Sequence, residues 1–538
     1  MKTEFDYIIV GAGSAGCVLA NRLSENGKYD VALVEAGGSD KSFWVSTPLG
    51  IGKIWQDAKF SWQYWTNPEK SLAEQKVFWP RGAVLGGSSS INGMIFVRGE
   101  PKRYDEWRDA GNKGWGWDDL YPYFQRLEDA PAETDDPTRG RGGPMKCSYG
   151  VYRDPISHSF LEAAQGIGIP FNPDYNGQKA DGVGWLQFTI NKGKRHSTAK
   201  GYLYPVMGRP NLTVLTHAPC EQVLFEGKRA KGIRIAHEGM THELKARREV
   251  ILSAGPIISP KILELSGIGQ PKLLKKHGID VLHDLPGVGE NLLDHLHTRF
   301  NYQVNKAVTL NDVLTSKVNS ILAGIKYLTT GKGLLATSTV TAHAMTRSHE
   351  AAPYADLKLQ IAMYSAKDRY LAEDGPPTDT FSGIGLGQFQ IYPESRGSVH
   401  VTSANPADFP EMNANYFSAQ GDIQTALAGM RKLREIARHP AMAQHIIDET
   451  DPGFDFDSDN EIIEFMKRTG QTSWHPISSC RMGAGSMDVV DDRLRVHGME
   501  GLRVIDSSIF PTMPATNTNI PTIAIAEKGA TMVLEDAQ

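Results

Sequence analysis

The first forty residues constrain this chain more than any other stretch. Residues 7–10 form a short apolar run with the length and branching of a buried parallel strand. The glycine-rich segment 11–16 follows at once, residues 17–23 carry apolar side chains at helical spacing, and a second apolar run ends in Glu35. A strand, a GxGxxG turn, a helix and a strand ending in an acid are typical of a dinucleotide-binding unit.

Each part of this unit has a physical reason. Gly11 permits the tight turn, Gly13 lets a pyrophosphate approach the backbone, and Gly16 lets the helix pack closely on the strand. The helix that begins behind them offers free N–H groups and the positive end of its dipole to phosphates. Glu35 lies about 20 residues beyond the last glycine, where it can hold ribose hydroxyls. The motif predicts a bound dinucleotide but does not separate NAD from FAD.

Composition narrows the class of protein. The chain has 538 residues, too many for one simple core, and its net charge of −5 indicates no nucleic-acid-binding face. Its four cysteines are scattered without CxxC spacing, which favours reduced thiols over a disulfide framework or a zinc site. The first strand begins too early for a signal peptide, and no apolar run reaches membrane-spanning length. We expect a cytoplasmic protein, with peripheral contact at the inner face of the membrane left open.

Two stretches after Glu35 contain candidate cofactor contacts. Residues 40–80 are rich in aromatic side chains, which we interpret as packing, with Trp62 as a candidate neighbour of the cofactor ring. Residues 81–99 combine glycines, three consecutive serines and Asn92. Small residues let backbone N–H groups converge on a ligand, whereas the hydroxyls and Asn92 are equally suited to cap a helix. A second cofactor contact and a simple N-cap therefore both remain open on chemistry alone.

Here the chain resembles the glucose-methanol-choline (GMC) oxidoreductases, which are FAD enzymes. Residues 81–99 resemble the first signature of that family, and residues 255–269 match the spacing of the second. Residues 475–483 resemble its catalytic histidine segment, and residues 506–528 resemble its C-terminal flavin-binding segment. Because these motifs run in the family's order from residue 5 to about residue 530, the resemblance covers essentially the whole chain.

Two departures from the family pattern matter. Ala83 stands where the family often has lysine or arginine, so a cationic contact is in doubt. Ile91 stands where members that bond FAD covalently carry a histidine, so the resemblance implies non-covalent FAD. The resemblance also assigns a set of positions to the FAD site: Gly11, Gly13, Ser14, Ala15, Glu35, Ala36, Trp62, Arg81, Val84, Gly87, Ser88, Asn92, Gly93, Met94, Ile95, Cys220, Gly255, Trp474, Asp506, Ser507, Asn519, Pro521 and Thr522.

His475 and Asn519 carry the catalytic hypothesis. Oxidising an alcohol requires a base for the hydroxyl proton and an acceptor for hydride, and histidine suits the first task near neutral pH. Flavin N5 takes the hydride, and the amide of Asn519 can stabilise the developing alkoxide. The resemblance gives His475 and Asn519 these same roles.

The C-terminal segment is predicted to be a helix, and two further histidines are interpreted as structural. Pro521 suits the first turn of a terminal helix, whose N-terminus would face the flavin pyrimidine ring. His295 and His297, beside Asp294, are interpreted as turn or interface residues, because a metal site would lack a third ligand. No metal is predicted.

These observations predict the architecture. We expect an α/β class fold with a discontinuous Rossmann-like FAD-binding domain formed by residues 1–155, 195–300 and 470–538. Residues 156–194 and 301–469 should form an α+β substrate domain with a mostly antiparallel sheet. The active site should lie between the two domains.

The predicted activity is oxidation of a primary alcohol, aliphatic or aromatic, to the aldehyde. The proton passes to His475, the hydride passes to FAD, and the electrons then pass to a quinone or another carrier. Trp474 argues mildly against sugars, and no cationic anchor for choline is identifiable. Three alternatives stay open: an oxidase that produces hydrogen peroxide, an FAD-containing hydroxynitrile lyase, and a non-catalytic FAD-binding protein.

Overall fold

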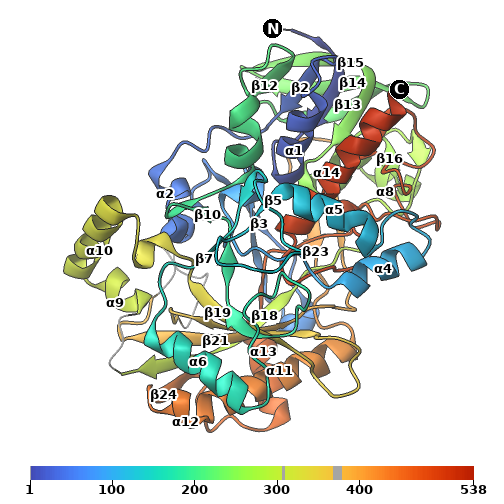
Figure 1. The fold of residues 1–538 in the computed structure, drawn as a ribbon. Helices are drawn as coiled ribbons and strands as arrows, with labels where there is room; N and C mark the ends of the chain where they lie inside the picture. The colour runs from blue at the N-terminus through green and yellow to red at the C-terminus, as the bar shows by residue number, and fades with distance from the viewer. Residues whose placement is uncertain (1, 306–308, 367–377) are drawn as a thin grey trace.

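The computed structural model describes residues 2–305, 309–366 and 378–538 (Figure 1). Its first sheet begins with the strand β1, Glu4–Val10, whose buried apolar run pairs in parallel on both sides. The strand order is β12-β2-β1-β15-β14-β13, and β26 pairs with β15. The other strands are β2 (Val31–Val34), β12 (Leu212–Leu215), β13 (Cys220–Glu226), β14 (Arg229–His237), β15 (Met240–Leu252) and β26 (Leu502–Val504).

Three helices meet this sheet near the carboxyl ends of its parallel strands. The helix α1, Ser14–Leu23, follows β1 directly, and α7, Gly255–Leu265, follows β15. The C-terminal helix α14, Asn519–Asp536, packs against α1 and against α5, Trp117–Leu127. A segment more than 480 residues from the N-terminus thus covers the glycine turn (Figure 1).

A second sheet is antiparallel throughout its described strands. Its order is β24-β18-β21-β20-β19-β8, and the short strand β25 pairs with β18. The strands are β8 (Gly182–Trp185), β18 (Leu296–Val304), β19 (Val340–Thr346), β20 (Leu357–Ala362), β21 (Gly383–Gln390), β24 (Ile446–Asp451) and β25 (Gln471–Thr472). The helix α11, Gln420–Arg438, packs on β21 and β20 (Figure 1). The predicted α/β fold with an antiparallel second sheet is confirmed.

The strand β18 crosses the domain boundary that we expected at residue 300. It begins at Leu296, and its first residues pair with β25. The end of the predicted segment 195–300 and the start of the predicted segment 470–538 are therefore joined by strand pairing. This pairing lies immediately beside residues 473–475.

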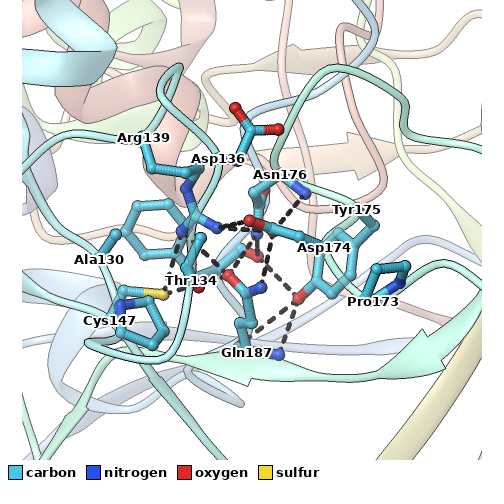
Figure 2. Close-up of polar contacts among 12 residues, drawn as sticks. Ala130, Thr134, Asp136, Arg139, Cys147, Pro173, Asp174, Tyr175, Asn176 and Gln187 are labelled. Carbon is cyan, nitrogen blue, oxygen red and sulfur yellow. Dashed lines mark hydrogen bonds and ion pairs between the residues drawn. The ribbon is translucent and has the colours of Figure 1, made fainter.

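A buried polar network ties together the segments that lead from the first sheet to the second. Arg139 forms ion pairs with Glu128 and with Asp174, the latter at 2.6 Å, and Gln187 bonds both Arg139 and Asp174 (Figure 2). The side chain of Arg139 is fully buried. Because an unpaired charge is costly to bury, these partners fix the loops around α6, Pro155–Gly166, and β8.

Candidate active site

The loop 472–475 brings His475 to the interface between the two sheets. The bulky residue Trp474 has φ of 60°, a left-handed conformation that only strong surrounding contacts maintain. Its amide donates to Thr472 Oγ1 at 2.6 Å, and its carbonyl accepts from Arg81 at 3.0 Å. Its indole ring packs at a tilt against that of Trp55, with ring centres 4.3 Å apart. This held turn directs the next side chain, His475, inward.

The carboxylate of Asp294 holds the same turn through hydrogen bonds. It accepts hydrogen bonds from the backbone N–H of His475 at 2.7 Å, from Tyr416 at 2.5 Å and from Thr472. Burial raises the pKa of Asp294 to about 6, although these donors oppose the rise. The carboxylate holds the backbone of the loop and is occupied by these donors.

His295 corrects our interpretation of this segment. We expected a turn or interface residue, but His295 is fully buried, and its Nδ1 lies 2.9 Å from Nδ1 of His475. Its other nitrogen, Nε2, bonds the carbonyl of Ile391 at 2.7 Å. The two histidines lie 180 residues apart and meet only because β25 pairs with the start of β18.

These bonds determine which nitrogen of His475 is free to act. The Ile391 carbonyl can only accept, so His295 Nε2 carries a hydrogen, and burial lowers the pKa of His295 to about 3 and keeps it neutral. His295 Nδ1 is therefore an acceptor, and His475 Nδ1 carries the shared hydrogen. Burial, with the charges of nearby groups, also lowers the pKa of His475 well below its ordinary value. Neutral His475 thus presents a lone pair at Nε2.

The residue facing that lone pair is Asn517, not Asn519. The amide nitrogen of Asn517 donates to His475 Nε2 at 2.9 Å, whereas the Oδ1 atom of Asn519 accepts from Ser14 Oγ at 2.7 Å. Asn517 lies in the loop before α14, while Asn519 is the first residue of that helix, so their side chains leave in different directions. The expected His475–Asn519 pairing is wrong, and the repeated Thr-Asn-Thr-Asn sequence offers no signal to choose between the two.

A buried lysine completes the cluster. The Nζ atom of Lys358, on β20, donates to Asn517 Oδ1 at 3.1 Å and lies 5.4 Å from the centre of the Phe389 ring. Burial lowers the pKa of Lys358 to about 7. The bond to the amide oxygen turns the NH₂ group of Asn517 toward His475. Sequence reasoning missed Lys358, which has no local motif around it.

The glycine motif forms a second part of the site. A Cβ at Gly87 would lie 2.7 Å from the Cα of Gly13, so the two glycine-rich turns face each other with no room for a side chain at Gly87. The helix α1 has no side-chain cap at Gly13, and α14 has none at Thr518. The uncapped N-termini of both helices therefore approach this cradle, joined by the Ser14–Asn519 bond.

Glu35 lies beside the cradle, at the end of β2. Its carboxylate oxygens accept from the backbone N–H groups of Ala12 and Gly37, each at 2.8 Å. Burial raises its pKa to about 7. Arg195 lies among Asn92 and Ser89 and is buried, and within the described part of the chain its Nη2 atom has no hydrogen-bond partner.

The remaining predicted residues lie in identifiable places. The carboxylate of Asp506 accepts from the N–H of Gly255 at 2.8 Å and so holds the start of α7. Asn92 accepts from the N–H of Met94 at 3.0 Å, and Cys220 begins β13. The ring of Trp62 packs against Tyr64 and Phe409. The tryptophan that contacts Trp474, beside His475, is Trp55.

Comparison with known proteins decides the family. Two models described as GMC oxidoreductase match residues 5–297 and 393–526. The chain belongs to the GMC oxidoreductases. As a member of that family it is an FAD-dependent enzyme that oxidises alcohols at a CH–OH group.

Its relatives cover it almost completely. It is 40% identical to an oxygen-dependent choline dehydrogenase of Photobacterium profundum, over 99% of this chain and 94% of that protein. It is 38% identical to an alcohol dehydrogenase [acceptor] of Pseudomonas putida, over 98% of this chain and 96% of that one. The crystal structure of pyridoxine 4-oxidase from Mesorbium loti superimposes with a TM-score of 0.89 at 29% identity, covering 98% of this chain and 99% of that one.

The cradle fits the family cofactor. A Gly87 without space for a Cβ opposite Gly13, two uncapped helix N-termini, and a buried guanidinium whose Nη2 is unpaired among the described residues suit the diphosphate of FAD. Arg81 is half-buried, and desolvation lowers its pKa to about 10. Gly13, Gly87 and Ser14 would lie at the phosphates, and Glu35 at the adenosine ribose.

Proposed function

We propose that this GMC oxidoreductase converts a primary alcohol, aliphatic or aromatic, to the aldehyde, with His475 as the base. The observation that carries the proposal is the lone pair of neutral His475 Nε2, held in place by His295 on the opposite nitrogen. A substrate hydroxyl that displaces the direct Asn517–Nε2 hydrogen bond would donate its proton to Nε2 and accept a hydrogen bond from the Asn517 amide.

The protein's own groups support each stage of that proton transfer. FAD, when bound, supplies the hydride acceptor. His475 gains a proton at Nε2, and its Nδ1–H continues to donate to His295, which stabilises the imidazolium. Asn517 takes the oxyanion-stabilising role that we first expected of Asn519, because its NH₂ group faces His475 and Lys358 holds its oxygen.

Anaerobic mixing of the FAD-loaded enzyme with a panel of alcohols tests the proposal. At least one primary alcohol should bleach the oxidised flavin absorbance while the matching aldehyde appears in equal amount. Cleavage of a cyanohydrin without bleaching by any alcohol would instead support the lyase alternative.

Lys358 predicts a preference for uncharged alcohols over quaternary ammonium alcohols. Its ammonium is separated from His475 only by the amide of Asn517, and the oxygens of Asp294 are occupied by other donors. At pH 6, below its pKa of about 7, the lysine is largely protonated. We expect choline to reduce the flavin at least about tenfold more slowly than its uncharged isostere 3,3-dimethylbutan-1-ol.

The pH dependence of this rate ratio, and its value in two lysine variants, test whether Lys358 causes the discrimination against choline. Lys358 loses its proton as the pH rises through about 7, so the discrimination against choline should shrink at pH 8. Lys358→Met should shrink it at pH 6 as well. Lys261→Met removes another buried lysine, which bonds the carbonyls of Pro406 and Asp408, and should leave the ratio unchanged. Faster reduction by choline than by its isostere would contradict the prediction.

We also propose that the FAD is held without a covalent bond. Ile91 is buried in an apolar cluster with Val45, Ile54, Phe60 and Val84, and it offers no nucleophile to the flavin ring. Acid precipitation should therefore release all of the yellow flavin into the supernatant, where its absorbance can be compared with that of the intact enzyme. Yellow colour retained in the washed pellet would disprove the proposal.

The electron acceptor we propose is a quinone or another carrier rather than oxygen. Reoxidation of the alcohol-reduced enzyme should be faster with a soluble quinone than in air-saturated buffer, as followed by recovery of flavin absorbance. Reoxidation by oxygen at the turnover rate, with hydrogen peroxide formed in step with aldehyde, would assign the enzyme to the oxidases instead.

A further inference from the structure

The helix α10, Lys317–Thr330, exposes an unusual amount of apolar surface. Tyr327 is its one buried residue, and it anchors the helix through a 3.2 Å bond from its hydroxyl to the carbonyl of Gly193. The face of α10 opposite Tyr327 carries exposed apolar side chains. Together with Leu314 of the preceding helix α9, Leu310–Thr315, we call these side chains the α10 stripe. Its members are 53–71% exposed: Leu314, Val318, Ile321, Leu322, Ile325 and Leu328.

The spacing of these residues makes the stripe continuous. Positions 318, 321, 322 and 325 recur at intervals of three and four, which places them on one side of a helix. The helix lies at the edge of the molecule, beside α9 (Figure 1). None of the described residues covers the α10 stripe. Contiguous exposed apolar surface of this kind marks an interaction site.

The charges around the stripe indicate what it contacts. Lys317 and Lys326 lie on its two flanks and Lys332 follows the helix, all three exposed, while residues 313–333 contain no acidic residue. Gly193 packs against Gly331, so the exposed Lys192 and Lys194 join the same rim. They belong to the hairpin of β10, Ile190–Asn191, and β11, Lys194–Arg195. Among the described residues, the charged side chains of α10 and of this hairpin are therefore all positive.

Two exposed aromatic residues lie on a neighbouring element, on the side of α10 that Tyr327 anchors. Phe43 of α2, Phe43–Ser46, meets Tyr327 with ring centres 6.3 Å apart, and Phe43 and Trp44 are 50% and 45% exposed. The exposed aliphatic residues of α10 and its flanking lysines are the composition of a helix that lies in a lipid–water interface. A second copy of this chain is a poorer partner, because a symmetric contact would bring the two lysine rims together.

We propose that the α10 stripe binds the surface of a membrane that contains anionic lipids. The apolar side chains enter the interface, and the lysines contact the lipid phosphates. The contact is peripheral: among the described helices, none has the length and apolar character needed to cross a bilayer. The proposal does not depend on which alcohol the enzyme oxidises.

Vesicle flotation of the FAD-loaded enzyme tests this surface. The protein should float with vesicles of phosphatidylcholine mixed with phosphatidylglycerol, and less with phosphatidylcholine alone. Ile321→Ser combined with Ile325→Ser should lower the partition coefficient at least about tenfold, because both side chains lose their apolar contact with lipid. Lys317→Gln and Lys326→Gln should each lower binding to the mixed vesicles by about fivefold.

Matched controls separate this role from general surface hydrophobicity. Met240 and Ile447 are 60% and 57% exposed on other elements, and the Met240→Ser, Ile447→Ser double variant should bind as wild type. All variants should reduce their flavin with a soluble alcohol at the wild-type rate. Wild-type protein that stays unbound with both vesicles, or an Ile321→Ser, Ile325→Ser variant that binds normally, overturns the proposal. If that variant instead converts a dimer to a monomer in light scattering without affecting vesicle binding, a second copy covers the stripe and the proposal is wrong.

Discussion

Replacing His475 with alanine should slow alcohol-dependent flavin reduction by about 10²–10⁴-fold, the usual effect of losing a positioned general base. The reason is specific to this site. His475 is neutral, its Nδ1 hydrogen is shared with His295, and its Nε2 carries the lone pair that faces Asn517. Stopped-flow spectroscopy of the flavin band under anaerobic conditions measures the effect directly.

A matched histidine variant controls for indirect damage. His445 is partly buried and bonds Ser159 at 3.0 Å in the second sheet's surroundings, so His445→Ala should reduce its flavin at the wild-type rate. Both variants should retain FAD, which the flavin-to-protein absorbance ratio reports. A His475→Ala enzyme that keeps its FAD and reduces it normally would remove His475 from the mechanism.

The two asparagines before and at the start of α14 should give opposite results. Asn517→Ala should slow flavin reduction by about 10²–10³-fold, or ~2.7–4 kcal/mol, because it removes the donor to the developing oxyanion. Asn519→Ala should chiefly weaken FAD retention, because its side chain joins the helix N-termini at the cradle through Ser14.

Stopped-flow rates on the FAD-loaded fraction, together with the FAD content of each purified variant, distinguish the two roles. Asn517→Asp offers a further comparison, since it keeps the size of the side chain but removes the NH₂ donor toward His475. If Asn519→Ala slows reduction and Asn517→Ala does not, then the assignment based on sequence alone was the better one.

The correction at Asn519 shows what limits inference from sequence at this site. Both asparagines occupy a Thr-Asn-Thr-Asn repeat, and their spacing is compatible with either role. The choice depends on where the helix begins: Asn519 is already inside α14 and faces α1, while Asn517 precedes it and faces β20 and the 472–475 loop. A start of this helix two residues earlier would put Asn517 in the place that Asn519 now holds.

The sequence by itself determined the dinucleotide-binding unit, the α/β fold and the family, because the strand, glycine turn, helix and acid are contiguous and the other motifs keep their order. Only the tertiary structure decided the surroundings of His475. His295, Asn517 and Lys358 come from three other segments, and each meets the site through strand pairing or helix docking far from its own position in the chain. Local periodicity predicts that such segments form strands and helices, but it carries no information about which buried side chains will face one another across two packed sheets. The tautomer of His475 depends on those contacts, and so it could be assigned only from the folded protein.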